Sequence, residues 1–170
     1  SHLYKIPVTG MRFFTVYGPW GRPDMAPMIF ANSIIKKQPI RIFNNGDMYR
    51  DFTYVDDVVK AIIQLIKKPS MPNLKFKKEN PDPSSSWSPF RIFNIGNSKT
   101  ISLMQFIEIL ENELGIKAIK KFEPMQAGDV KITSANTTAL DSFIGYKPST
   151  RLEKGIKEFI SWYKNYYGID

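Results

Sequence analysis

Apolar and polar positions along the chain form short, distinct runs, and five of these runs have the composition of β-strands. The run at residues 8–17 is rich in β-branched and aromatic side chains and does not alternate cleanly with polar ones. Such a run is typical of a parallel-sheet strand that is covered on both faces. Shorter runs predict the other strands, at residues 40–43, 50–54, 90–95 and 116–122.

Runs with helical periodicity separate the predicted strands. Residues 28–37 and 138–143 are predicted to be helical. Ser102 and Gln105 form a capping box at the start of a third predicted helix, over residues 103–114. Strands that alternate with helices place the chain in the α/β class.

Two more helices are predicted from the faces they would present. Asp56 precedes an apolar run and is predicted to cap a helix whose polar face would leave a core face of Val59, Ile62, Ile63 and Ile66. Thr150 and Glu153 form a second capping box ahead of the last helix. The apolar stripe of that helix comprises Ile156, Phe159, Ile160, Tyr163 and Tyr167.

Two segments show neither the pattern of a strand nor the periodicity of a helix. Residues 18–27 hold three prolines and two glycines around Trp20 and Arg22, just after a predicted strand. Loops in that position are where α/β proteins bind ligands. Trp20 could equally cover the core, and Arg22 could be a solvated charge. Residues 69–89 hold five prolines, which predicts an irregular and mobile excursion.

The composition argues against several classes of protein. With 42% hydrophobic and 14% aromatic residues, the 170-residue chain fits one folded domain rather than a disordered segment. It has no cysteine, and its single histidine is His2, so we expect no disulfide, thiol chemistry or histidine-based metal site. No run approaches the roughly 18 apolar residues of a membrane span, and we see no signal peptide. We therefore expect a cytoplasmic protein that does not engage membranes.

The formal net charge of +8 suggests an anionic partner. The lysines are spread along predicted helix faces and over residues 67–78, and no nucleic-acid-binding motif accompanies them. A small anionic ligand suits this charge as well as nucleic acid does, and solvated lysines explain most of it. We therefore do not expect a nucleic-acid-binding protein.

Arg50 is the first candidate for an anion-binding residue. It lies in the predicted strand at residues 50–54, between the turn dipeptide Asn45-Gly46 and the predicted helix that begins at Asp56. A guanidinium held in this way matches two oxygens of a phosphate or carboxylate. The spacing allows a surface ion pair with Asp51 or Asp56 just as well.

Three stretches together resemble one enzyme family: RFFTVYGPWGRPDM at residues 12–25, GDMYRDFTYVDDVVKAI at 46–62 and RIFNIGNS at 91–98. They are similar to the NAD-dependent epimerase/dehydratase family, the extended short-chain dehydrogenases that act on nucleotide sugars. Within it they resemble the UDP-glucuronate 4-epimerases of capsule and lipopolysaccharide pathways. The resemblance covers nearly all of residues 1–170 and is weakest at residues 73–89. It implies the carboxyl-terminal, substrate-binding part of such an enzyme, with the last strands of a Rossmann sheet.

The resemblance also implies how a UDP-sugar would be bound. Arg50 and Thr15 correspond to positions at the sugar diphosphate, and Arg22 to one that faces the sugar carboxylate. Asp129 corresponds to a residue near the ribose. The backbone of Arg41, Ile42 and Phe43 corresponds to the segment that frames the uracil. Relatives carry a phosphate-binding arginine ahead of Asp129, where this chain has Met125 and Gln126.

The cofactor implied by the resemblance is NAD, bound mainly by an amino-terminal half that these residues do not include. No GxxGxxG fingerprint and no Tyr-x-x-x-Lys pair occurs in the sequence, so no catalytic residue is assigned and the chain alone is predicted inactive. The backbone of Phe13 and Phe14 would approach the nicotinamide, although we favour core positions for both.

The implied reaction interconverts UDP-glucuronate and UDP-galacturonate by oxidation and reduction at C4. A UDP-glucose 4-epimerase or a nucleotide-sugar dehydratase would use the same scaffold. A truncated, non-catalytic remnant or binding module is an alternative of a different class. The expected partners are a UDP-sugar and the amino-terminal half of the same enzyme.

Overall fold

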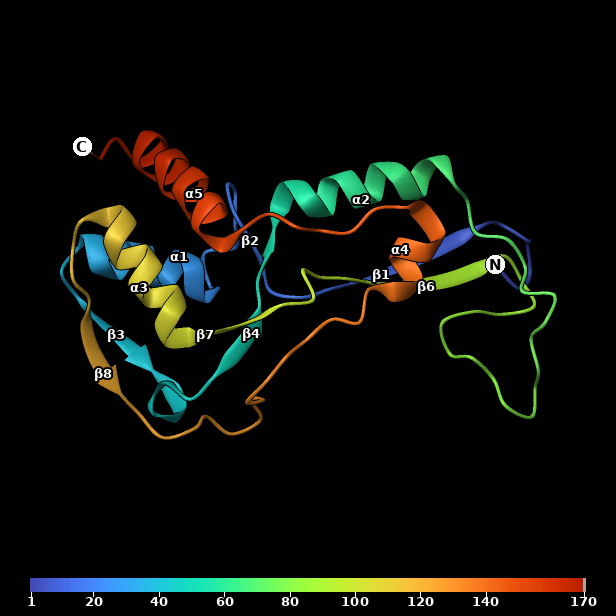
Figure 1. The fold of residues 1–170 in the computed structure, drawn as a ribbon, viewed down its shortest axis with the longest axis horizontal. Helices are drawn as coiled ribbons and strands as arrows, with labels where there is room; N and C mark the ends of the chain where they lie inside the picture. Colours follow the sequence, from blue (N-terminus) through green and yellow to red (C-terminus); the bar gives the residue numbers. More distant parts are fainter. Residues whose placement is uncertain (170) are drawn as a thin grey trace.

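The computed structural model describes residues 1–169, which form an elongated molecule with a helical end and a flatter end (Figure 1). Its α-helices over these residues are α1 (Ala26–Ile35), α2 (Val55–Lys67), α3 (Leu103–Leu114), α4 (Thr138–Ile144) and α5 (Leu152–Tyr167). A 3-10 helix, η1, covers Phe43–Gly46. Helices α1, α3 and α5 gather at one end of the molecule, and α2 and α4 lie at the other.

The strands are β1 (Val8–Phe13), β2 (Val16–Tyr17), β3 (Pro39–Ile42), β4 (Tyr49–Asp51), β5 (Thr53–Tyr54), β6 (Phe90–Ile95), β7 (Thr100–Ser102) and β8 (Ile119–Phe122). They pair two by two. Three pairs are parallel, β1 with β6, β2 with β5 and β3 with β8, whereas β4 and β7 are antiparallel. Helices between parallel strands confirm the α/β class.

Two hydrophobic cores hold these elements together. The first core lies at the helical end, where α1, α3 and α5 pack on β3; its fully buried members include Ala31, Ile40, Ile42, Phe106, Ile107, Leu110, Ile156 and Phe159. The second core lies between α2, α4 and β6 and comprises Val58, Ala61, Leu65, Phe93, Ile95 and Leu140. The predicted site residues lie nearer the first core, as described below.

One of the three predicted helix caps is present. The Oγ of Ser102 accepts a hydrogen bond from the N–H of Gln105 at 3.1 Å, so the predicted start of α3 is confirmed. The cap at Asp56 is wrong, because α2 begins at Val55 and Asp56 is an exposed residue of its first turn. The cap at Thr150 is also wrong. Its N–H donates to the carboxylate of Asp57, and α5 begins only at Leu152.

The predicted core face of α2 is right only in part, because Ile62 packs against the second core but the other three predicted residues do not. Val59, Ile63 and Ile66 are 46%, 47% and 72% exposed, whereas the second-core residues of α2 are buried. The cause is Asp57, which is buried because its carboxylate accepts hydrogen bonds from residues 146–150. A pattern of apolar and polar residues treats every aspartate as solvated and so misplaces the face.

The predicted strand at residues 8–17 is divided in two. The chain changes partner after Phe13, from β6 to β5, and the carbonyl of Thr15 accepts a hydrogen bond from the N–H of Thr53 at 3.0 Å. One face of β1 is uncovered in the described residues, where Phe13 is 51% exposed and Met11 is half-buried. The expected cover on both faces stays a prediction for the whole enzyme. Helices α2 and α4 lie along one side of the β1–β6 pair (Figure 1).

Other boundaries follow the predictions with small shifts. The predicted strand at 50–54 is interrupted at Phe52, and the one at 116–122 begins at Ile119. Tyr167 is half exposed, so it does not belong to the buried stripe of α5. The excursion at residues 69–89 has neither helix nor strand, as predicted.

Candidate functional site

An open cleft of about 620 Å³ lies at the helical end, between α1, β3 and β4. Five of the seven residues predicted to contact the substrate line it, and they come from four separate stretches of the chain: Thr15, Arg41, Phe43, Arg50 and Asp129. The first core supports the cleft from behind, because Phe30 and Phe52 belong to both. The cleft is therefore built on the first core.

Arg50 is the most constrained cation of the cleft. Its side chain is only 18% exposed, and its Nη1 donates to the carbonyls of Tyr49 at 2.9 Å and Lys131 at 3.1 Å. Its Nη2 donates to Oδ1 of Asp129 at 2.8 Å. The alternative of an ion pair with Asp51 or Asp56 is wrong, because the carboxylate partner of Arg50 is Asp129, far along the sequence. The guanidinium is thus held in one orientation, with an anion already beside it.

Arg41 lies at the end of β3 and faces Glu123 at the end of the paired strand β8. Its Nε donates to Oε2 of Glu123 at 2.8 Å, and its Cζ lies 4.8 Å from the ring centre of Phe43. The hydrogen bond from Arg41 lowers the pKa of Glu123. Ile42 is fully buried and does not line the cleft, and its carbonyl accepts the N–H of Glu123.

Arg22 lies outside the cleft, in an adjoining hollow of about 500 Å³ that shares Thr15 and Met25 with it. Its side chain is 74% exposed and pairs with Asp24, to which Nε donates at 3.1 Å. That hydrogen bond lowers the pKa of Asp24. Asp24 itself lines the cleft, so the pair bridges the two hollows.

Aromatic residues form much of the wall of the adjoining hollow. Phe13 and Phe14 line it together with Trp20, so the preference for core positions is wrong for the exposed Phe13. Trp20 is 72% exposed and contacts Trp162 and Tyr166 of α5, with ring centres 5.4 and 4.9 Å away. It does not cover the core.

The pattern of the sequence does not identify two residues that hold the arginines of the cleft, Glu123 and Lys131. Glu123 was not singled out, although its place directly after the strand at 116–122 was a usable signal. Gln126 lines the cleft at the segment where relatives were expected to carry an arginine. Lys131, from the same segment, contributes its carbonyl to Arg50, while its Nζ pairs with Asp47 at 2.5 Å. Arg41 and Arg50 are thus the two arginines that line the cleft among the described residues.

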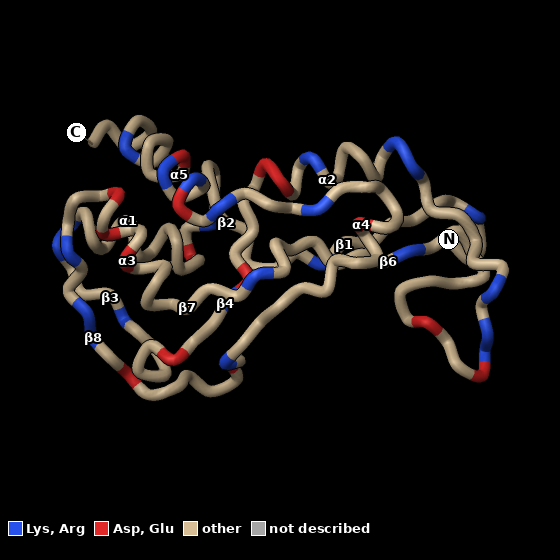
Figure 2. The backbone as a smooth tube through the Cα atoms, viewed as in Figure 1, with Lys and Arg blue, Asp and Glu red and all other residues tan. Residues whose placement is uncertain are grey.

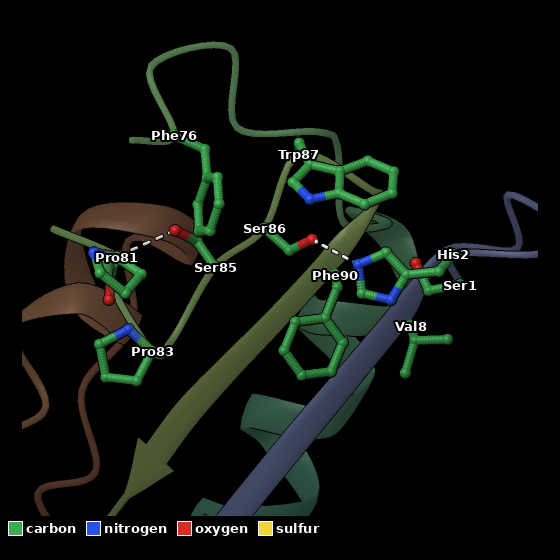
Figure 3. A pocket seen from close by; sticks show the side chains of 11 residues that line it. Ser1, His2, Val8, Phe76, Pro81, Pro83, Ser85, Ser86, Trp87 and Phe90 are labelled. Atoms are coloured by element: carbon green, nitrogen blue, oxygen red, sulfur yellow. Dashed lines mark hydrogen bonds between the residues drawn. The ribbon is translucent and has the colours of Figure 1, made fainter. Parts of the chain in front are cut away.

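A third hollow lies at the flatter end of the molecule, by the excursion (Figure 3). Trp87, Phe76, Phe90 and Val8 give it an apolar lining, and Ser86 Oγ lies 3.1 Å from Nε2 of His2. The residues that the sequence predicted for substrate binding line other hollows. This hollow is therefore separate from the candidate site.

The distribution of charges and of possible metal ligands leaves the two arginines of the cleft as its candidate anion-binding groups. Lysines and arginines are spread over both ends of the molecule rather than gathered in one stripe (Figure 2). Within residues 1–169 no group of histidine, cysteine, aspartate and glutamate residues is arranged to hold a metal ion. None of the helices in that range is long and apolar enough to cross a bilayer.

Comparison with known proteins supports the resemblance seen in the sequence. Residues 1–77 match the NAD dependent epimerase/dehydratase family. The protein CapI of Staphylococcus aureus is 50% identical over 167 residues, which are 98% of this chain and 50% of CapI. A probable UDP-glucuronate 4-epimerase of Rhizobium meliloti is 45% identical over 168 residues, covering 98% of this chain and 49% of that protein.

The fold has solved counterparts as well. A UDP-glucuronic acid 4-epimerase from Bacillus cereus, crystallised with UDP-glucuronic acid and NAD, superimposes with a TM-score of 0.79 at 29% identity. The match covers 98% of this chain and 48% of that enzyme. The chain thus spans about half the length of the relatives it matches.

Proposed function

We propose that this chain, part of a protein of the NAD-dependent epimerase/dehydratase family, is the substrate-binding portion of an enzyme that interconverts UDP-glucuronate and UDP-galacturonate. The observation that carries the proposal is the cleft at the helical end. Residues that the family resemblance assigns to one ligand, and that lie as far apart as Thr15 and Asp129, meet around it. The matches to a probable UDP-glucuronate 4-epimerase and to the Bacillus cereus enzyme favour this substrate.

Arg50 is the residue proposed to hold the diphosphate. Its Nη1 is fixed by two backbone carbonyls, and its Nη2 reaches the carboxylate of Asp129. Asp129 accepts a hydrogen bond from one N–H of Nη2, so a phosphate oxygen would contact the guanidinium at its remaining N–H groups. Because the guanidinium is already oriented, little conformational entropy is lost when the diphosphate binds.

The uracil is proposed to lie against the ends of β3 and η1. Arg41 and Phe43 line that part of the cleft, and the chain turns sharply just after Phe43, where Asn44, Asn45 and Gly46 have positive φ values. Ile42 contributes only backbone, since its side chain is buried in the first core. The base would thus meet a face built by backbone and by the Arg41–Phe43 pair.

Arg22 is proposed to contact the sugar carboxylate. It is paired with Asp24 on the border between the cleft and the adjoining hollow, and both side chains are well exposed. An exposed pair contributes little free energy, so a substrate carboxylate can replace Asp24 at small cost. Arg22 would then distinguish UDP-glucuronate from UDP-glucose.

NAD is proposed to bind mainly to an amino-terminal half that these residues do not include. When bound, NAD would take the hydride from C4 of the sugar and return it to the other face. This chain's contribution would be the backbone of Phe13 and Phe14, which lie in the adjoining hollow beside Thr15. The side chains at the end of β1 are half-buried or exposed, which leaves room for the nicotinamide ring to approach that backbone.

The test uses a reconstituted enzyme, in which this chain is co-expressed with an amino-terminal NAD-binding half. It should interconvert UDP-glucuronate and UDP-galacturonate, whereas the chain alone should not, since a positioned proton-transfer residue contributes roughly 10²–10⁴-fold and none is assigned here. Arg22→Ala should raise the KM for UDP-glucuronate far more than that for UDP-glucose. Equal changes would favour a UDP-glucose 4-epimerase. Failure of both sugars and of UDP to bind would leave a non-catalytic module and refute the proposal.

A further inference from the structure

Asp51 is a fully buried carboxylate that the proposed function leaves without a role. It ends β4, directly after Arg50. Three backbone N–H groups donate to it, that of Asn97 to Oδ1 at 2.8 Å and those of Ser98 and Ala135 to Oδ2 at 3.0 and 2.9 Å. These N–H groups replace the water that a buried charge loses, so the carboxylate is a fixed anchor for the segments that donate to it.

One anchored segment is residues 123–137, here called the crossing segment because it runs from β8 past β4 to α4 (Figure 1). Asp51 holds it at Ala135, and the N–H of Asp51 donates to Oγ1 of Thr133 at 3.4 Å. The fit around this anchor is tight. A Cβ on Gly96 would lie 2.3 Å from Cβ of Ala135 and 3.0 Å from Oδ2 of Asp51. The end of the crossing segment therefore has little freedom to move.

The crossing segment supplies two of the groups that orient Arg50. Asp129 accepts a hydrogen bond from Nη2, and the carbonyl of Lys131 accepts one from Nη1. The same carbonyl accepts the N–H of Tyr49 at 2.9 Å. Three consecutive residues of β4 thus hold the crossing segment, and Asp51 is the one that does so with a buried charge.

We propose that Asp51 is a positioning residue for the diphosphate site, acting on Arg50 through the crossing segment. With Ala135 fixed, Asp129 and the Lys131 carbonyl stay where they orient the guanidinium toward the cleft. Without that anchor, residues 126–133, most of which are exposed, would be held to β4 by the backbone hydrogen bonds of Tyr49 with Lys131 and Thr133, and both partners of Arg50 would be less firmly placed. This inference rests on the proposed function of Arg50.

Asp57 provides a matched control. It is 3% exposed, and its carboxylate accepts three hydrogen bonds of 2.8–3.0 Å, from the hydroxyl of Tyr146 and the N–H groups of Ser149 and Thr150. Those donors lead into α5 and not into the crossing segment. An Asp→Asn change at either site exchanges an acceptor oxygen for an NH2 group that faces a donor, so both variants lose stability for the same reason.

The experiment compares UDP and uridine binding by calorimetry to the reconstituted enzyme and its variants, at a temperature where circular dichroism shows each to be folded. Asp51→Asn should weaken UDP binding about tenfold and leave uridine binding within about twofold, since uridine has no diphosphate for Arg50 to hold. Asp57→Asn should leave both affinities within about twofold. Thr133→Val, which removes the acceptor for the Asp51 N–H at equal size, should shift UDP binding in the same direction by less.

A double-mutant cycle tests whether Asp51 acts through Arg50. In an Arg50→Lys background, Asp51→Asn should cause no further loss of UDP affinity. Additive losses, an equal loss of uridine binding, or UDP binding unchanged in both Asp51→Asn and Thr133→Val would show that Asp51 only stabilises the fold. Wild-type enzyme that binds no UDP at all would refute the proposed function instead, and the present inference with it.

Discussion

The two ends of the molecule differ in how completely they are covered. At the helical end, the first core is closed by α1, α3 and α5, and several of its large side chains are fully buried. At the flatter end, the second core is small, and Phe13 of β1 and three apolar residues of α2 remain exposed. The cleft of the candidate site thus lies at the more completely covered end, and the exposed apolar side chains of α2 lie at the other.

This contrast agrees with the coverage of the relatives. The chain matches about half of each of them. Under the proposed function, the other half of the enzyme would cover the exposed side of β1 and α2. Leaving such side chains in water forfeits about 1.5–3 kcal/mol for each that should be buried. We therefore expect the isolated chain to bind a hydrophobic dye and to associate through this end.

The largest expected effect is that of opening the first core. Phe106 is fully buried and stacks on Phe52, with ring centres 4.5 Å apart. Phe106→Ala should lower the free energy of unfolding by about 3–5 kcal/mol, from lost transfer energy and the cavity left behind. Urea denaturation measures it, with Ile63→Ala on α2 as the exposed control. A similar loss in both variants would contradict the contrast between the ends.

The next effect should be confined to the helical end. Arg50→Lys keeps the charge but loses the fork that contacts two oxygens, so UDP affinity should fall by about 1.5–3 kcal/mol, or ten- to a hundredfold. Isothermal titration calorimetry measures it on the reconstituted enzyme. Dye binding at the flatter end should stay unchanged. Wild-type UDP affinity in this variant would remove Arg50 from the diphosphate site.

Asp57 connects the two ends, because α2 presents it to the segment that leads into α5. Burial alone would raise its pKa, but hydrogen bonds from Thr150, Ser149 and Tyr146 outweigh burial and lower the pKa below 3.8. A lowered folded-state pKa contributes stability above about pH 4 that is lost as pH falls through that pKa.

Asp57→Asn should therefore be destabilised by about 1–3 kcal/mol at pH 7 and by progressively less in acid. Urea denaturation at a series of pH values between 7 and about 2.5 measures the difference. A destabilisation that stays constant over this range would show that the charge of Asp57 does not stabilise the junction.

The smallest effect on stability should come from α2. Replacing Ile63 and Ile66 with lysine should change the free energy of unfolding by less than about 0.5 kcal/mol each, because both are exposed. The same change should reduce dye binding and association of the isolated chain, measured by fluorescence and light scattering. If dye binding is unchanged, the exposed face of α2 is not the surface that binds the dye or through which the isolated chain associates.

Local signals in the sequence predicted the parts of the fold that local interactions determine. The capping box of Ser102 and the closing Gly115, with φ of 68°, define α3 within a residue of the prediction. The turn at Asn45-Gly46 also forms as expected. These features depend on backbone groups only a few residues away, which is why a single sequence reveals them.

Such local signals do not reveal contacts between residues that lie far apart in the sequence. Arg50 was recognised as a candidate, but its carboxylate partner, Asp129, lies on another segment. The sequence offers Asp51 only as a surface partner for Arg50 and gives no signal for Asp57, yet both carboxylates are buried and accept hydrogen bonds from N–H groups of loops far along the chain. Burial of an aspartate depends on those donors, and no periodicity encodes them.

The parallel pairing of β1 with β6 has a consequence for how the chain folds. Val8 pairs with Phe90, and α1, β3, β4, α2 and the excursion lie between them in the sequence. The β1–β6 pair can therefore form only when this long loop closes. Such topologies fold slowly, because chain entropy is lost before contacts compensate for it. The free-energy cost of closing the loop rises by only about 0.6 kcal/mol for each doubling of its length. A longer or shorter excursion should therefore change the cost of closing this loop only slightly.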